Sequence, residues 1–384
     1  VTVTEPAQPA TVADIVIEPL HEALFADGPA LLPRPGGVKI SATAPTEVED
    51  DVALVVETSG TTGAPKRVAL GAQALVASAE AATAQLGDPG TWLLVLPAHY
   101  IAGIQVITRS LIHGTLPLVL DPGPFSGSAV LARSAELISA AGSGAVYTAM
   151  VPAQLSRLLD AEADVPGLGE VMRAFSAILV GGQSVPQAVL DRAHDAGYRI
   201  IRTYGSAETA GGCVWDQRPI GDVRVAEFDG RLAISGSLLA HGYVDNPQRT
   251  ETSFVQREGT QWYLTDDAGE VDSNGLVHVH GRLDDVIISG GVKVSLGRIE
   301  KLLHAHIDSA DLVVVGCESD QWGHVPVVVT TAELNLERLR LLVQQELGPE
   351  ARPERIHRVE ALTFLPSGKP DRLALSALVA QGQA

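Results

Sequence analysis

The feature that most constrains the fold is an alternation of two kinds of segment between Val52 and Thr203. Short β-rich runs at 93–96 and 116–120 have the composition of strands. Longer stretches rich in Ala and Leu read as helices, at 128–141, 151–159 and 186–195. Such alternation is typical of an α/β domain whose helices cover buried, mostly parallel strands. We therefore expect a large N-terminal α/β sandwich.

The pattern changes after about Gly230, where short strands and turn signals become frequent. Three runs predict a small β region that closes the large domain, at 231–235, 262–265 and 275–281. Strands and two helices after Asp284 then predict a small α+β domain of about 100 residues. A chain of 384 residues suits one large and one smaller domain. We place them at 1–283 and 284–384.

Charge and composition exclude several classes of protein. A formal net charge of -19, with no cluster of Lys and Arg, argues against nucleic-acid binding. Cys213 and Cys317 are far apart, which gives neither a disulfide framework nor a metal-ligand spacing, and indicates a reducing compartment. The first ten residues lack the pattern of a signal peptide, and no run of roughly 18 apolar residues follows. We expect a cytoplasmic protein without membrane insertion, and a homodimer stays open beside a monomer.

A loop with the chemistry of a phosphate site follows the strand-like run VALVVET. It combines glycines, hydroxyls and one lysine in the order Ser59, Gly60, Thr61, Thr62, Gly63, Ala64, Pro65 and Lys66. Backbone N–H groups, hydroxyls and a cation can together wrap phosphates. The loop differs from that of the nucleoside triphosphatases, which needs Gly-Lys-Ser/Thr in succession. A mobile turn is the alternative interpretation.

The loop resembles the phosphate loop of the acyl-adenylate-forming family, which includes acyl- and aryl-CoA ligases, peptide-synthetase adenylation domains and firefly luciferase. Further motifs of that family recur in order: YGSAET at 204–209, WYLTDD at 262–267, GRLDD at 281–285 and PSGK at 366–369. The resemblance covers about 52–372. It implies that the chain activates a carboxylic acid with ATP and Mg²⁺ as an acyl-adenylate. The acyl group then passes to a thiol, that of coenzyme A.

The resemblance also assigns roles to single residues. Tyr204 and Gly205 would lie near the adenine, Glu208 would bind magnesium and Asp267 the ribose hydroxyls. An ionised carboxylate needs no general base, only in-line positioning and neutralisation of the leaving pyrophosphate. Magnesium prefers one or two carboxylates plus phosphate oxygens, which suits Glu208. The catalytic cations would be Arg282 and Lys369. Glu208 or Lys369 taken alone would be interpreted as a surface charge.

Two positions depart from the family pattern. Ala207 stands where a threonine is usual, so Ser206 or Thr209 would have to supply the hydroxyl. Asp266 stands where a glycine is usual, which gives two candidates for the ribose ligand. The spacing favours Asp267.

For the second half-reaction the resemblance implies that a mobile small domain swings about a hinge at Asp284. This rotation would withdraw Lys369 and present the segment 289–293 to the incoming thiol. Gly290 and Gly291 would permit close backbone approach, and Lys293 could meet a coenzyme A phosphate. An exposed cation at a helix edge is the alternative for Lys293.

The acid substrate is suggested by the segment PAHYIAG at 97–103, with Arg109 downstream. These features resemble the 2-succinylbenzoate–CoA ligases of menaquinone biosynthesis, in particular their compact actinobacterial forms. The ring carboxylate of that substrate calls for a cation or strong donors in the pocket. Arg109 is the candidate cation, and His99 and Tyr100 would line the pocket. The substrate-floor loop would contain Gly181, Gly182 and Gln183.

Alternatives remain both for single residues and for the function of the protein. Arg109 could be a helix-surface charge and His99 a satisfied loop histidine. The enzyme could be another CoA ligase, or a free-standing adenylation enzyme that loads a carrier protein. A non-catalytic nucleotide-binding protein on the same scaffold is opposed by the presence of Lys369, Glu208 and Arg282.

Overall fold

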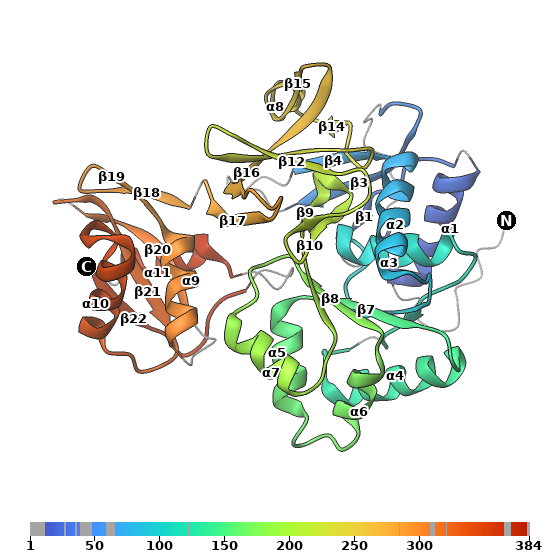
Figure 1. The fold of residues 1–384 in the computed structure, drawn as a ribbon, viewed down its shortest axis with the longest axis horizontal. Coiled ribbons are helices and arrows are strands. Elements are labelled where there is room, and N and C mark those ends of the chain that lie inside the picture. The colour runs from blue at the N-terminus through green and yellow to red at the C-terminus, as the bar shows by residue number, and fades with distance from the viewer. Residues whose placement is uncertain are drawn as a thin grey trace.

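The computed structural model describes residues 12–26, 28–34, 37–38, 48–58, 66–121, 123–283, 285–307, 312–319, 321–364 and 370–381. Within these ranges the chain forms a large N-terminal lobe and a small C-terminal lobe, drawn in orange and red in Figure 1. The expected two-part α/β architecture is therefore present. Asp284 lies outside the described ranges, so the predicted boundary and hinge stay predictions.

A seven-stranded sheet in the order β11-β10-β9-β8-β7-β5-β6 forms the centre of the large lobe. Five of its strands are parallel: β5 (Thr91–Leu94), β6 (Leu118–Val119), β7 (Val146–Met150), β8 (Ala177–Gly181) and β9 (Ile200–Ser206). The antiparallel strands β10 (Gly211–Trp215) and β11 (Arg218–Pro219) extend one side. The mostly parallel sheet predicted from the sequence is confirmed.

Helices cover both faces of this sheet because successive strand residues point to opposite sides. Leu93 packs in one core, whereas Trp92 and Leu94 pack in the other. The first core takes residues from α4 (Gly127–Ala141), α5 (Pro152–Ala161), α6 (Leu168–Ala174) and α7 (Gln187–Asp195). The second core takes residues from α1 (Val12–Phe25), α2 (Ala72–Leu86) and α3 (Ile101–Leu111).

Two smaller sheets complete the large lobe. One has the order β14-β4-β3, with β3 (Val52–Thr58), β4 (Lys66–Gly71) and β14 (Gly242–Tyr243). The other joins β12 (Arg224–Phe228), β13 (Arg231–Ser235), β15 (Phe254–Arg257), β16 (Thr260–Val271) and β17 (Val277–Arg282). The short helices η1 (Ala207–Thr209) and α8 (Pro247–Ser253) lie between these strands in sequence, and β1 (Pro33–Arg34) pairs with β2 (Gly37–Val38). The predicted small β region is thus real, and its strands carry Asp266, Asp267 and Arg282.

The small lobe is a sheet with helices on both faces. Its strands are β18 (Val286–Ser289), β19 (Val292–Ser295), β20 (Leu312–Ser319), β21 (Gly323–Thr330) and β22 (Arg355–Arg358). One face packs on α9 (Leu296–His306) and α10 (Leu336–Leu347), and the other on α11 (Arg372–Gln381). The sequence predicted two helices in this part of the chain, whereas the structure has a further one, α11, which buries Leu375 and Val379 completely. The short 3-10 turn η2 (Pro349–Ala351) precedes β22.

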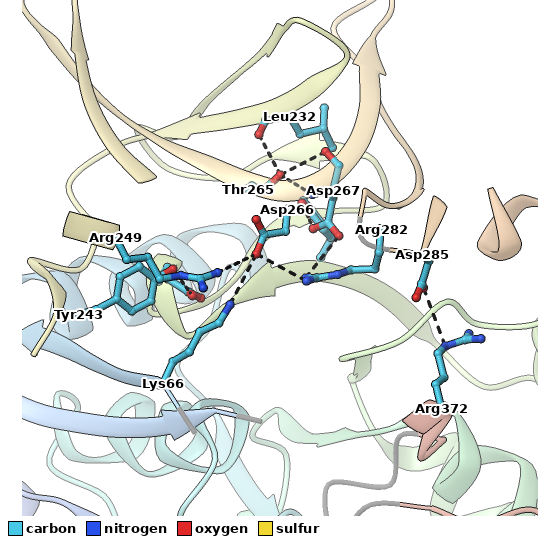
Figure 2. Close-up of polar contacts among 12 residues, drawn as sticks. Lys66, Leu232, Tyr243, Arg249, Thr265, Asp266, Asp267, Arg282, Asp285 and Arg372 are labelled. Carbon is cyan, nitrogen blue, oxygen red and sulfur yellow. Dashed lines mark hydrogen bonds and ion pairs between the residues drawn. The ribbon is translucent and has the colours of Figure 1, made fainter. Parts of the chain in front are cut away.

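Arg372 fastens the start of α11 to the rest of the small lobe. Its guanidinium lies 2.9 Å from Glu300, donates to the Val314 carbonyl at 2.7 Å and lies 3.8 Å from Asp285 (Figure 2). Glu300 in turn accepts from the Val314 N–H. The first turn of the last helix is thereby tied to the residue that follows Asp284. Across the described ranges, the helices are all too short or too polar to cross a bilayer.

Candidate active site

The candidate site lies where the parallel strands end, which is where open α/β sheets bind ligands. β8 ends at Gly181, and β9 ends at Ser206, directly before η1. A Cβ atom on Gly181 would collide with the Thr203 side chain, and one on Gly205 would collide with the Gly211 carbonyl. Only glycine fits at these two positions, so the strand ends pack unusually close together.

Glu208 sits in η1 and is only 6% exposed. Its Oε1 accepts a hydrogen bond from the Tyr243 hydroxyl at 2.9 Å. Burial, reinforced by Glu208, raises the pKa of Tyr243 to about 12, so this tyrosine remains a donor at neutral pH. In the part of the chain that the structure describes, nothing donates a hydrogen bond to the second oxygen, Oε2. A buried carboxylate with one unused oxygen is suited to a cation.

Two hydroxyls, of Ser206 and Thr209, are the candidates to replace the one missing at Ala207, and their hydrogen bonds differ. Thr209 is fully used, because its hydroxyl accepts from the Ser206 N–H and donates to the Ser206 and Gly211 carbonyls. The Ser206 hydroxyl is buried and has no hydrogen-bond partner among the described residues. Ser206 is therefore the better candidate.

Asp267 is held beside Tyr204. The Tyr204 hydroxyl donates to Asp267 Oδ2 at 2.7 Å, and burial together with that carboxylate raises the pKa of Tyr204 well above its usual value. The Thr265 hydroxyl accepts from the Asp267 N–H at 3.1 Å and donates to the Leu232 carbonyl (Figure 2). Asp267 is thus next to the tyrosine expected near adenine, which supports it as the ribose ligand.

Asp266 lies among three cations, as Figure 2 shows. Its Oδ2 is 3.6 Å from Lys66 Nζ, 3.3 Å from Arg249 Nη2 and 3.5 Å from Arg282 Nη2. Arg282 also lies 3.9 Å from Asp267 Oδ1. We call Lys66, Arg249, Asp266 and Arg282 the Asp266 cluster. It brings together residues from β4, α8, β16 and β17.

Arg249 was not expected from the sequence. It follows the Asn246 cap of α8, and its guanidinium lies over the Tyr243 ring at 5.2 Å from the centroid. A single arginine in a seven-residue helix carries no motif that would have singled it out. Only the spatial contact with Asp266 and Tyr243 reveals it.

His99 and Tyr100 lie directly before α3, with ring centroids 4.2 Å apart. Both ring nitrogens of His99 are buried without a hydrogen-bond partner in the described chain. Burial lowers the pKa of His99, so its imidazole is kept neutral, and burial raises the pKa of Tyr100. The alternative of a satisfied loop histidine does not describe His99, because its ring nitrogens lack protein partners.

Arg109 lies in the last turn of α3 and is 5% exposed, so it is not a helix-surface charge. Its guanidinium carbon lies 5.0 Å from the centroid of the Trp92 ring, and burial lowers the pKa of Arg109 to about 10. Its Nε is buried without a partner, and no carboxylate of the described residues pairs with the side chain. α3 separates Arg109 from His99, so the two side chains belong to opposite ends of one helix.

The predicted substrate-floor loop begins at the end of strand β8. Gly181 ends β8, Gly182 has a φ of +82°, and Gln183 follows them. Lys293 is exposed on the edge strand β19, so it is not a helix-edge cation. Seven predicted site residues lie outside the described ranges and stay predictions: Ser59, Gly60, Thr61, Thr62, Gly63, Asp284 and Lys369.

Comparison with known proteins decides the family. The pattern of the AMP-binding enzyme family matches residues 4–244, and that of the AMP-binding enzyme C-terminal domain matches 298–369. The chain belongs to the AMP-binding enzymes. This AMP-binding enzyme is 38% identical over 376 residues to a probable 2-succinylbenzoate–CoA ligase of Mycobacterium tuberculosis, with 94% of each chain covered.

More distant relatives are also similar to this chain. The AMP-binding enzyme is 30% identical to a 2-succinylbenzoate–CoA ligase of Listeria monocytogenes, over 83% of this chain and 68% of the relative. A solved o-succinylbenzoate CoA synthetase of Bacillus subtilis, in complex with its acyl-adenylate intermediate, superposes with a TM-score of 0.70. That comparison has 26% identity and covers 84% of this chain and 69% of the other. An amide bond synthetase of Marinactinospora thermotolerans shares the fold, with a TM-score of 0.73, 24% identity and coverages of 91% and 74%.

Proposed function

We propose that this AMP-binding enzyme converts 2-succinylbenzoate to 2-succinylbenzoyl-CoA in two steps. ATP and the acid first give an acyl-adenylate and pyrophosphate. The coenzyme A thiol then displaces AMP and forms the thioester. The observation that carries the reaction class is a buried carboxylate, Glu208, in the same site as a three-cation cluster at the carboxyl ends of the parallel strands. The relatives' substrate supplies the identity of the acid.

Magnesium and ATP fit the described residues. Mg²⁺ takes one or two carboxylates and completes its shell with phosphate oxygens and water. Glu208 would hold it through Oε2, while Tyr243 keeps Oε1 in place. Bound there, the metal supplies positive charge to the triphosphate. Ser206 would add a hydroxyl donor on the same strand end.

Beside the metal, cationic side chains of the protein would bind the phosphate groups. Lys66 and Arg282 project toward the same point from two different sheets, which suits groups that bind phosphate oxygens. Tyr204 and Asp267 form a hydrogen-bonded pair that would hold the adenosine portion. Because the attacking carboxylate is already ionised, these residues only need to position it and neutralise the leaving group.

Arg109 would bind the ring carboxylate. Burying an arginine without a partner carboxylate is costly, and an anion from the substrate would remove that cost. At the other end of α3, neutral His99 and Tyr100 would line the acid pocket, with Gly181, Gly182 and Gln183 as its floor. His99 can donate or accept a hydrogen bond there without adding charge.

For the thioester step we keep the two-conformation proposal. The domains would meet at Asp284, and rotation would exchange Lys369 for the face around Lys293. The support is local: Gly290 and Gly291 both have positive φ values, +57° and +83°, and form the tight turn beside exposed Lys293.

The test is pyrophosphate release from ATP across a panel of acids, with and without coenzyme A. Release should be fastest with 2-succinylbenzoate, and a thioester should form only when coenzyme A is present. A parallel assay with a carrier protein in place of coenzyme A as the acyl acceptor distinguishes a CoA ligase from a stand-alone adenylation enzyme. If another acid is preferred by tenfold or more, the substrate proposal is wrong while the reaction class stands.

Cytoplasmic location and a homodimer are proposals of the same kind. Both cysteines are free and buried, which supports a reducing compartment. Fractionation of cells and light scattering of the purified enzyme measure the two directly.

A further inference from the structure

One carboxylate oxygen of Asp266 is shared by three cations. Lys66, Arg249 and Arg282 all approach Oδ2, and each distance lies between 3.3 and 3.6 Å. A terminal phosphate oxygen has the same charge sign and attracts the same donors. Oδ2 therefore sits where three cations would meet an oxygen of a nucleotide phosphate.

The three contacts are long for charge-assisted hydrogen bonds, which are usually about 2.7–2.9 Å. Only the contact from Arg249 meets hydrogen-bond geometry. The side chain of Asp266 is 31% exposed, so water screens each pair. Contacts of this kind keep cations near a point without binding them tightly, and a stronger anion can replace the carboxylate.

Arg249 adds a separate indication that the cluster is built for an anion. It stacks on Tyr243, which in turn donates to Glu208, so it joins the cation cluster to the expected metal ligand. Its Nε is buried and has no partner among the described residues. A buried donor left unused costs free energy unless something else accepts its hydrogen bond.

We propose that Asp266 is an internal counterion that occupies the position of a nucleotide phosphate oxygen. The Asp266 proposal deepens the proposed function and rests on that function, because it takes Lys66 and Arg282 as phosphate ligands. Asp266 is a positioning residue: it keeps the three cations close together when no nucleotide is bound. When a nucleotide binds, a phosphate oxygen replaces the Asp266 carboxylate as their partner. Because the carboxylate stays close by, it also opposes the binding of ATP and of pyrophosphate, and so favours release of pyrophosphate.

The sign of the effect follows from charge. ATP and pyrophosphate must displace Asp266 from the cations and then remain near its negative charge. Replacing it with the isosteric, neutral asparagine removes both costs. Adenosine has no phosphate, so its binding does not depend on the displacement.

The experiment compares Asp266→Asn with the parent enzyme by calorimetric titration with pyrophosphate, ATP and adenosine. The variant should bind pyrophosphate and ATP about three- to tenfold more tightly, as expected for a partly screened ion pair. Adenosine affinity should be unchanged, and pyrophosphate should become a stronger product inhibitor by the same factor. Asp160→Asn is the matched control, because Asp160 pairs with Arg192 on helices outside the cluster; its affinities should equal the parent's.

Three outcomes would overturn the proposal: weaker pyrophosphate binding by Asp266→Asn, unchanged binding, or a parallel loss of adenosine binding. The last would make Asp266 the ribose ligand. If Asp266→Asn does not fold, Asp266→Gly, which carries the residue usual in the family, is tested in the same titrations. A parent enzyme that binds neither ATP nor pyrophosphate would instead contradict the proposed function.

Discussion

At the scale of single residues, several candidate site residues have buried polar atoms without protein partners among the described residues. Ser206 Oγ, Arg109 Nε and the ring nitrogens of His99 are all buried and unpaired within the described chain. Folded proteins pair nearly all such groups, so each of these exceptions needs an explanation. Substrate groups that complete the hydrogen bonds provide one, and this leads to predictions at individual side chains.

Arg109→Ala should weaken use of 2-succinylbenzoate about tenfold to hundredfold, which is the value of one charge-assisted contact. An analogue without the ring carboxylate should be affected much less. The measurement is kcat/KM for both acids, with Arg133→Ala as control, a half-buried arginine that pairs with Asp121 and Glu136. Equal losses on the two acids would mean that Arg109 acts through its packing on Trp92 instead.

His99 gives a prediction for pH. Burial lowers its pKa below the usual 6.5, so the unfolded chain takes up the proton first. The stability is therefore fully present above about pH 6.5 and falls as the pH is lowered through the interval down to the folded pKa. His99→Asn should flatten this fall in denaturant unfolding between pH 7 and 5. The exposed His324→Asn should leave the slope as in the parent, and an unchanged slope in His99→Asn would refute the assignment.

At the scale of elements, close backbone packing at the ends of β9 and β10 positions Glu208. Gly205→Ala would force its Cβ into the Gly211 carbonyl, at a cost of about 1–3 kcal/mol. We expect a lower melting temperature and a loss of adenylation, because η1 would shift. Gly297→Ala is the control, since a Cβ there meets nothing closer than 3.6 Å. Normal adenylation by Gly205→Ala would show that the strand ends tolerate movement.

Periodicity predicted most of these elements and missed others for physical reasons. The run at 231–235 was expected at the residues where β13 occurs, because a short, continuous apolar run is typical of a strand buried on both faces. α11 was not predicted, because its short span buries only Leu375 and Val379 and so gives a weak periodic signal, although Asp371 caps it by accepting a hydrogen bond from the Ala374 N–H. In the site, the sequence motifs single out Glu208 and Asp267, and the roles of both residues stay predictions. Arg249 could not be singled out, because its role depends on a contact 17 residues away with Asp266.

At the scale of the whole molecule, we propose that the two half-reactions use different arrangements of the lobes. Lys369→Ala should reduce acyl-adenylate formation by about 10²–10³-fold, as for loss of one strong electrostatic donor. Thioester formation from chemically made succinylbenzoyl-adenylate and coenzyme A should survive. If the rates of both half-reactions fall equally, the lysine either acts in both steps or stabilises the fold of the small lobe. The two-conformation proposal then loses its main support.

The small-lobe sheet is buried on both faces, with Val314 and Val328 in one core and Val313, Val315 and Val327 in the other. Amides in β20 and β21 should therefore exchange with deuterated solvent only when the entire lobe unfolds. Their exchange rates would be the same with and without nucleotide as long as the lobe turns as one body. Any nucleotide-dependent change in deuterium uptake should then be confined to its outer surface and to the connection that follows β17.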